Sequence, residues 1–160
     1  MIDAFSSTAP ALSASLPDQY LRQFMDEDPM VWSEKYSIGI GVIDTPHEEL
    51  FDAINDLYLA VFGEEDREVV SSLLTRLVEA AHAQFTAEEA LMETVKYTGR
   101  ALHALKHQYL LDQLDAFAAR FHRGIELNEH SLIFIRDWAI PHILDADANF
   151  GHWYREHCLS

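Results

Sequence analysis

Mainly apolar side chains, with polar residues at a few positions, recur along four stretches of the chain at alternating steps of three and four residues. The four series are His47, Phe51, Ile54, Tyr58 and Val61; Val70, Leu74, Leu77, Ala81, Gln84, Glu88, Leu91 and Val95; His103, His107, Leu110, Leu114, Phe117 and Phe121; and Ser131, Ile135, Trp138 and His142. This spacing lines one face of an α-helix, whereas a half-buried strand would alternate at every second residue. The pattern therefore predicts four amphipathic helices that each bury one face.

The breaks between these series predict where the helices end. Gly63, Gly99 and Gly124 fall between the four stretches, where helix stops belong, and Pro141 disturbs the last stretch near its end. Four helices joined by short connections are typical of an antiparallel four-helix bundle. We therefore expect an all-α fold of this kind.

The first helix carries a start signal of its own. Thr45, Pro46 and Glu48 fit a threonine N-cap, a proline at the first helical position and a glutamate at the third. Together they form a capping box, so we expect the helix to begin at Thr45.

The composition is that of a soluble globular chain with a strong acidic bias. Hydrophobic residues make up 49% of the 160, and 27 acidic residues against 11 Lys and Arg give a formal net charge of −16. Such a charge repels phosphate backbones and anionic lipid heads, which argues against nucleic-acid and membrane partners. Residues 1–29 are rich in Ala, Ser and Pro and predict an N-terminal arm, loosely ordered or docking, ahead of a bundle over residues 30–155.

Cysteine usage and hydropathy suggest a cytoplasmic protein. Cys158 is the only cysteine, so no disulfide can form within the chain, and a reducing compartment is the simplest interpretation. The N-terminal stretch lacks the basic region and the sustained apolar run of a signal peptide. No stretch approaches the roughly 20 apolar residues that span a bilayer.

The predicted helices place polar or ionisable side chains at positions of their inward faces. These side chains are His47, Gln84, Glu88, His103, His107 and His142. Asp147 follows His142 by five residues, at or past the expected helix end, where a frayed or bent backbone could turn it inward. His82 lies two residues from Gln84, about 200° around the second helix, and points away.

A metal centre accounts for this set of buried polar groups. Burying several imidazoles and carboxylates without partners costs several kcal/mol, which coordination of a metal offsets. Nitrogen and carboxylate ligands without an inward cysteine suit iron, manganese or zinc, and their number favours two ions bridged by carboxylates. The alternative is that these histidines are hydrogen-bonded core residues. The histidines without inward phasing are His122, His130, His152 and His157.

Four segments of the chain resemble the bacterial hemerythrins, which are non-haem di-iron oxygen-binding proteins. The segments read GVIDTPHEELFDAIN, QFTAEEALM, KYTGRALHALKH and FIRDWAIPHILDAD. The resemblance covers about residues 30 to 150 and includes Trp32, which precedes the first motif. It implies an up-down-up-down four-helix bundle that holds two iron ions. The related myohemerythrin has that topology.

The resemblance also assigns most of the inward residues. His103, His107 and His142 match the three histidines on one iron, and Glu88 and Asp147 match the two bridging carboxylates. This implies that one iron keeps the family's full set of protein ligands.

The other iron is where this chain departs from the family. His47 matches one of its two histidines, but the second histidine position falls on Gln84. An amide oxygen is a neutral and weaker donor than an imidazole, so we expect lower affinity at that ion or a preference for harder metals. The site would then hold two irons, one iron or a mixed pair of metals, and neutral drift is an alternative explanation of the change.

The ligand pocket carries a second departure. Leu50, Phe85, Trp138 and Ile143 match apolar positions that line the oxygen pocket of the family, whereas Ala139 stands where family members usually carry leucine. The smaller side chain is expected to widen the pocket and to admit water or larger ligands.

Three functions fit this sequence. The first is reversible binding of O2 for storage, delivery or sensing, and the absence of a catalytic acid, base or nucleophile beyond the metal ligands favours a binding protein over an enzyme. The second is a di-iron or mono-iron redox enzyme or responder for peroxide or nitric oxide, which the changes at Gln84 and Ala139 motivate. The third is a metal-poor module that binds a protein partner.

Overall fold

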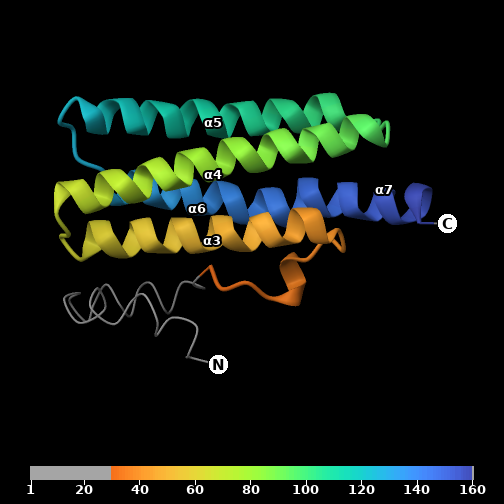
Figure 1. Ribbon diagram of the computed structural model, residues 1–160, viewed down its shortest axis with the longest axis horizontal. Coiled ribbons are helices and arrows are strands. Elements are labelled where there is room, and N and C mark those ends of the chain that lie inside the picture. The colour runs from red at the N-terminus through yellow and green to blue at the C-terminus, as the bar shows by residue number, and fades with distance from the viewer. Residues whose placement is uncertain (1–29, 160) are drawn as a thin grey trace.

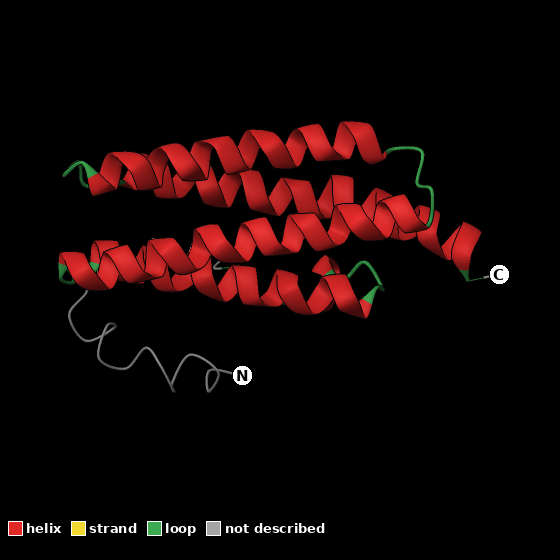
Figure 2. Ribbon diagram, turned by 45° about the horizontal axis from the view of Figure 1, so that its top comes forward, coloured by secondary structure: helices red, strands yellow, loops and turns green. Residues whose placement is uncertain are grey.

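The computed structural model describes residues 30–159, so the predicted N-terminal arm lies outside the described residues. Helices account for the regular structure of the described part, with no strand among them (Figure 2). The elements are a 3-10 helix η1 (Glu34–Tyr36), α3 (Gly41–Phe62), α4 (Arg67–Thr94), α5 (Arg100–His122), α6 (Glu129–His142), a π-helical turn η2 (Ile143–Asp147) and α7 (Ala148–Cys158). The predicted all-α four-helix bundle is confirmed (Figure 1).

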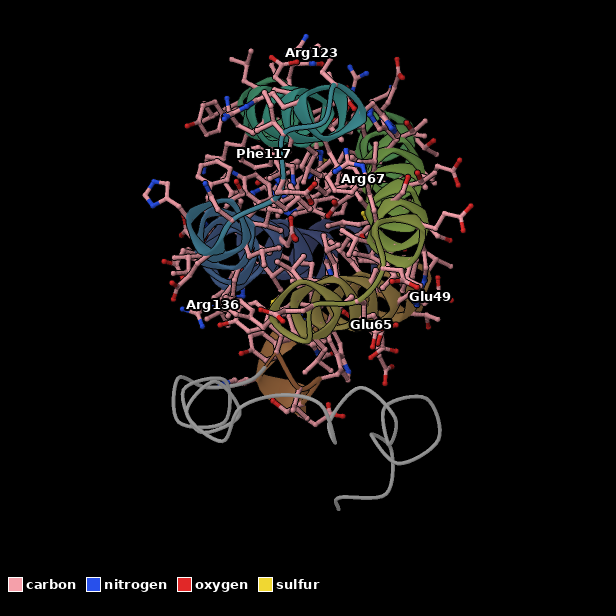
Figure 3. All side chains as sticks on the ribbon, turned by 90° about the vertical axis from the view of Figure 1, so that its left-hand side faces the viewer. Glu49, Glu65, Arg67, Phe117, Arg123 and Arg136 are labelled. Atoms are coloured by element: carbon pink, nitrogen blue, oxygen red, sulfur yellow. The ribbon has the colours of Figure 1, made fainter. Side chains whose placement is uncertain are left out.

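The order of the helices around the bundle follows their order in the sequence. Seen end-on, α3, α4, α5 and α6 surround a common interior, and α6 returns beside α3 (Figure 3). Connections of a few residues join successive helices, such as 63–66 between α3 and α4. Connections this short force sequential helices to be antiparallel neighbours, which gives the up-down-up-down topology.

The first long helix begins earlier than the capping box predicts. α3 starts at Gly41 with Ile40 at its N-cap, and the backbone N–H groups of Ile43 and Asp44 already donate to the Ile40 carbonyl. Pro46 therefore lies inside the helix, and the predicted start at Thr45 is wrong. The turn forms upstream because Asp44 is fixed: its carboxylate accepts from the Ser37 hydroxyl at 2.7 Å and from the Ile38 N–H at 2.8 Å.

The helix ends agree only in part with the glycine pattern. Gly63 does cap α3, but the left-handed conformation falls on the next residue, Glu64, at φ 55°. Lys96, at φ 57°, takes this conformation after α4, whereas Gly99 is the N-cap of α5. Only Gly124, at φ 93°, supplies the left-handed glycine expected just past a helix end.

The last helix does not end near Pro141. Instead α6 passes through the π-helical turn η2 into α7, which runs on to Cys158, beyond the expected bundle boundary at residue 155. Proline has no N–H to donate, so Pro141 removes one of the backbone hydrogen bonds of α6. The π-helical turn η2 starts two residues later.

α7 is held against the start of α3 by a small apolar cluster of its own. The cluster contains Ile38, Ile40, Ile43, Met92 and Phe150. The Arg155 guanidinium donates to the Ile38 carbonyl at 2.8 Å, and Gly151 lies so close that an added Cβ would be 2.5 Å from the same carbonyl oxygen. The segment before α3 and the last helix therefore meet backbone to backbone.

The surface histidines and the helix hydropathy agree with the sequence analysis. His82, His122, His130, His152 and His157 are all exposed, so these histidines do not enter the core. No helix within residues 30–159 is long and apolar enough to cross a membrane.

We expect Gly151→Ala to destabilise the fold by about 1–3 kcal/mol, because the new methyl group overlaps a backbone carbonyl that cannot move aside cheaply. Thermal unfolding monitored by circular dichroism measures the effect. Gly41→Ala is the matched control: a Cβ there meets nothing within 4 Å, and its melting temperature should be unchanged or slightly raised. Equal melting temperatures for both variants would contradict the close contact.

Candidate metal centre

Every residue predicted to face the metal is buried, and together they come from all parts of the bundle. α3 supplies His47, α4 supplies Gln84 and Glu88, α5 supplies His103 and His107, α6 supplies His142 and η2 supplies Asp147. The helical phase derived from the sequence accounts for the six side chains on the helices, and Asp147 in η2 is the seventh.

The carboxylate of Asp147 is the centre of this cluster. Its Oδ1 lies 3.0 Å from Nε2 of His103 and 3.0 Å from Nε2 of His142, and its Oδ2 lies 3.0 Å from Nε2 of His47. Asp147 is 0% exposed. One carboxylate thus faces imidazoles from three different helices, which is the arrangement of a bridging ligand.

Three imidazole nitrogens converge on one side of that carboxylate. His107 Nε2 lies 3.1 Å from His103 Nε2 and 3.1 Å from His142 Nε2. With Asp147 these three histidines form a group of four ligand atoms within 4.8 Å of one another. A tetrad of this composition is a suitable partial coordination shell for iron, zinc or manganese.

A second, smaller group of ligands overlaps the first. His47, Glu88 and Asp147 also place ligand atoms within 4.8 Å of one another. Glu88 Oε2 is 3.3 Å from His107 Nε2, so its carboxylate, like that of Asp147, lies between the two groups. Two ligand sets that share the Asp147 carboxylate fit two cations side by side.

The π-helical turn explains why Asp147 faces inward. In a regular α-helix, residues five apart are rotated by about 140° from one another, so Asp147 would leave the face that carries His142. A π turn pairs residue i with residue i+5 and brings both onto the same face. Sequence reasoning expected a frayed helix end here; the inward direction agrees, but its cause is a wider turn inside a continuing helix.

Several ligand atoms have no protein partner of good geometry. Both carboxylate oxygens of Glu88 and of Asp147, and both ring nitrogens of His47, are buried without a well-oriented hydrogen bond, although the distances to their neighbours are short. Buried polar atoms left unpaired cost about 1–3 kcal/mol each. Lone pairs that converge without hydrogen-bond geometry are what bound cations require.

The pKa directions show how strongly the cluster is coupled. Burial opposes ionisation of Asp147, but the facing imidazoles of His103, His142 and His47 hold its pKa well below the ordinary value. Burial, and then the charge of Asp147, raise the pKa of the Glu88 carboxyl. A cation would compete with protons for these ligands, since histidine and carboxylate bind metals in their deprotonated forms.

The histidines differ among themselves for the same reasons. Burial lowers the pKa of His142. Burial also opposes protonation of His47 and His107, but the carboxylate of Asp147 beside His47 and that of Glu88 beside His107 outweigh it and raise both pKa values.

His107 is held from outside the cluster by a residue that the sequence analysis missed. Its Nδ1 lies 2.8 Å from Oε1 of Glu89, and its ring stacks on Phe85 at a centroid distance of 3.9 Å and an angle of 2°. A carboxylate on the far nitrogen fixes the tautomer that presents Nε2 to a metal. Glu89 follows Glu88 directly, about 100° around α4, so the inward stripe contains no signal for it.

Gln84 is buried in the position that sequence reasoning gave it. Neither its amide oxygen nor its amide nitrogen has a hydrogen-bond partner. The amide lines a pocket together with His47, Leu50, Phe85, Trp138, Ala139, His142, Ile143 and Asp147. The structure therefore brings all five predicted pocket residues to one place beside Gln84.

The pocket is narrow. Its lining encloses about 180 Å³ of space between atoms, part of it open to solvent, and none of it is wide enough for a water molecule. The Trp138 ring stacks on His142 at a centroid distance of 4.3 Å and restricts the pocket further. The widening expected beside Ala139 is not visible as water-sized space, because large neighbours close around the methyl group.

Comparisons with known proteins agree with this geometry. No protein-family model matches the sequence. Among curated relatives, the bacteriohemerythrin of Methylococcus capsulatus is 29% identical over 125 residues, covering 76% of this chain and 94% of its own, and that of Stenotrophomonas maltophilia is 26% identical over 128 residues, covering 80% and 83%. The myohemerythrin of Sipunculus nudus is 26% identical over 123 residues, covering 77% and 92%.

The solved structures give the same result. A wild-type hemerythrin superimposes with a TM-score of 0.72 at 27% identity, covering 75% of this chain and 93% of its own. The chain is therefore similar to the hemerythrins in both sequence and fold. A hemerythrin in which one leucine is replaced by alanine matches equally well, with a TM-score of 0.72 at 28% identity.

We expect Glu89→Ala to weaken metal binding by this chain about 10–100-fold, because His107 loses the carboxylate that orients it. Glu89→Gln should retain most of the affinity, since an amide oxygen still accepts from Nδ1. Competition with a chromophoric chelator measures both variants. Glu93→Ala removes an exposed carboxylate one turn further along α4, where it pairs with Arg100 at 3.3 Å, and should change nothing; equal losses for Glu89→Ala and Glu93→Ala would contradict the role of Glu89.

Proposed function

We propose that this chain is a non-haem di-iron protein that binds O2 for storage, delivery or sensing, with an altered ligand set at one iron. The observation that carries the proposal is the pair of overlapping ligand groups that share Asp147. Relatives named bacteriohemerythrin and myohemerythrin support iron and O2 as the metal and ligand class.

The residues divide between the two ions according to their position in the cluster. His103, His107 and His142 would hold one ion and His47 the other, with Asp147 and Glu88 available to both. Two ferrous ions, when bound, would supply the electrons that reversible O2 binding requires. The protein's own part is to fix the ligands from separate helices and to keep the surroundings dry.

Gln84 alters the side of the site that faces the pocket. Its amide can offer only a neutral oxygen where the family has an imidazole, so the ion beside His47 is held by fewer strong donors. We infer that this ion binds more weakly than its partner and exchanges for a harder metal such as manganese more readily. The unpartnered state of the buried amide supports a role towards a metal or a ligand.

The pocket lining favours a small ligand. Leu50, Phe85, Ala139 and Ile143 present apolar groups to the space beside Gln84 and His47. Exclusion of water protects a reactive bound ligand from hydrolysis and proton leakage. So narrow a space excludes a larger organic substrate, and a diatomic molecule or peroxide needs the least displacement of the lining side chains.

A second candidate function is a redox responder or enzyme for peroxide or nitric oxide on the same scaffold. The specific observation in its favour is Gln84, because a loosely held ion beside the pocket would leave the oxygenated state short-lived. Rapid autoxidation with turnover of peroxide would identify it. A metal-poor module that binds a protein partner is the remaining alternative, and a chain that purifies folded, free of iron, manganese and zinc and indifferent to chelators would establish it instead.

The decisive experiment measures iron per chain and the visible spectrum before and after air, after anaerobic purification. We expect one tightly and one weakly held iron in the parent chain, and we expect Gln84→His to tighten the second iron and prolong the oxygenated state. Gln108→His, an exposed substitution of the same kind on α5, is the control and should behave as the parent. If Gln84→His and the parent retain iron equally and autoxidise at equal rates, Gln84 is not the determinant.

We expect Ala139→Leu to slow autoxidation, because a larger apolar side chain at this position further restricts the entry of water to the pocket. Stopped-flow spectroscopy of the oxygenated form measures the decay. Leu144→Ala changes an exposed apolar residue near the same end of α6 and should leave the decay unchanged. An unchanged decay in Ala139→Leu would mean that this position does not control access to the metal.

A further inference from the structure

The outer face of α5 exposes large apolar side chains that the metal site does not use. Leu102 is 64% exposed, Leu105 is 67% exposed and Tyr109 is 52% exposed. α5 forms one edge of the bundle in Figure 1, and in the end view of Figure 3 Phe117 points into the bundle while Arg123 points away from it. The helix that presents His103 and His107 to the core therefore carries a second apolar stripe on its outside.

This stripe differs from the other exposed apolar residues of the described chain. Those others are single side chains on separate elements or connections: Val31, Val42, Val69, Ile125, Leu144 and Leu159. Single exposed apolar residues need no explanation, whereas a contiguous set on one helix marks an interaction surface.

The stripe continues along the helix with the spacing of a packing seam. Leu102, Leu105 and Tyr109 are followed at steps of three and four by Asp112, Ala116 and Ala119, all of them exposed. Steps that average 3.5 residues keep one face of a helix against a partner helix. The N-terminal half of this seam is bulky, and its C-terminal half is small.

We propose that the outer face of α5 binds the same face of a second copy of this chain, with the two helices antiparallel. In this orientation the bulky half of each helix lies on the small half of the other. Leu102 packs opposite Ala119 of the second copy, and Leu105 opposite Ala116. Large residues against alanines allow two helices to approach closely, and no other orientation of two identical α5 helices matches large to small along the whole seam.

The charges on α5 also favour a second copy of this chain as the partner. The chain as a whole has a formal net charge of −16, but α5 contains three Arg and Lys residues against two Asp residues. Two strongly acidic copies repel one another least where acidic side chains are few. The outside of α3 is the opposite case, with Glu48, Glu49 and Asp52 exposed together.

The single acidic residue within the seam has donors available. Asp112 Oδ1 already accepts from the Gln108 amide at 2.8 Å. In the antiparallel arrangement Asp112 lies opposite Tyr109 of the second copy, whose hydroxyl can donate to the remaining oxygen. The carboxylate is thus satisfied at the centre of the interface.

The interface leaves the proposed ligand pocket free. The residues that line the pocket come from α3, α4, α6 and η2, and none comes from α5. A dimer formed through α5 would therefore cover no residue that lines the pocket, so association and ligand binding are compatible.

Sedimentation velocity of the full chain over a range of concentrations tests the proposal. We expect a monomer–dimer equilibrium, and Leu105→Glu should weaken dimerisation about tenfold or more, because it buries a charge in the seam. Val42→Glu places the same charge at an equally apolar exposed position on α3, where Val42 is 72% exposed, and should leave the equilibrium unchanged. A monomer at every concentration, or a dimer that both variants or neither variant weakens, overturns the proposal.

Cysteine cross-linking tests the orientation. In a Cys158→Ser background, protein carrying Leu105→Cys is mixed with protein carrying Ala116→Cys and oxidised. The antiparallel seam predicts disulfides mainly between the two different proteins, because each cysteine lies about 16 Å along the helix from its own copy in the partner, beyond disulfide reach. Disulfides formed equally well within each single variant overturn the antiparallel arrangement.

Discussion

The buried carboxylate of Asp147 is the charge on which the arrangement of the bundle interior depends. It faces His47 from α3, His103 from α5 and His142 from α6, each at 3.0 Å. An isolated carboxylate in the core would be far too costly, so these helices must keep their imidazoles in place around it. The same contact therefore joins three helices and defines the point that two ligand groups share. The contacts that hold the three helices together around Asp147 are thus the same contacts that bring the candidate metal ligands together.

The π-helical turn is the local device that makes this charge available. It carries Asp147 onto the face of His142, and the helix then continues into α7, whose Phe150 and Gly151 pack against the segment before α3. A helix that ended at Pro141 would provide neither the bridging position nor this second apolar cluster. The π-helical turn therefore connects the candidate metal centre to α7, which packs against the segment before α3.

The sequence predicts the bundle and six inward polar residues because both depend on one quantity, the periodicity of a helix. Features with another origin escape that reasoning. Asp147 faces inward through a π turn, Glu89 reaches His107 from the flank of α4, and the start of α3 is set by the carboxylate of Asp44. The left-handed residues Glu64 and Lys96 show that the surrounding packing can impose a conformation that the residue type does not favour. The donor set suits iron, manganese or zinc alike, and only the resemblance to hemerythrins favours iron among them.

α4 carries Gln84, where we propose that the ligand set differs, and the neighbouring residues of α4 show what a buried amide at this position would affect. Phe85 stacks on the His107 ring and Glu89 contacts its Nδ1, while Glu88 lies between the two ligand groups. One short stretch of α4 therefore contributes to both ligand groups. Within that stretch Gln84 buries an amide with no protein partner, at a cost of about 1–3 kcal/mol. An apolar side chain of similar size would avoid that cost and would pack better against Phe85 and Leu50. The amide is understandable if its missing partner is the bound metal or the ligand in the pocket.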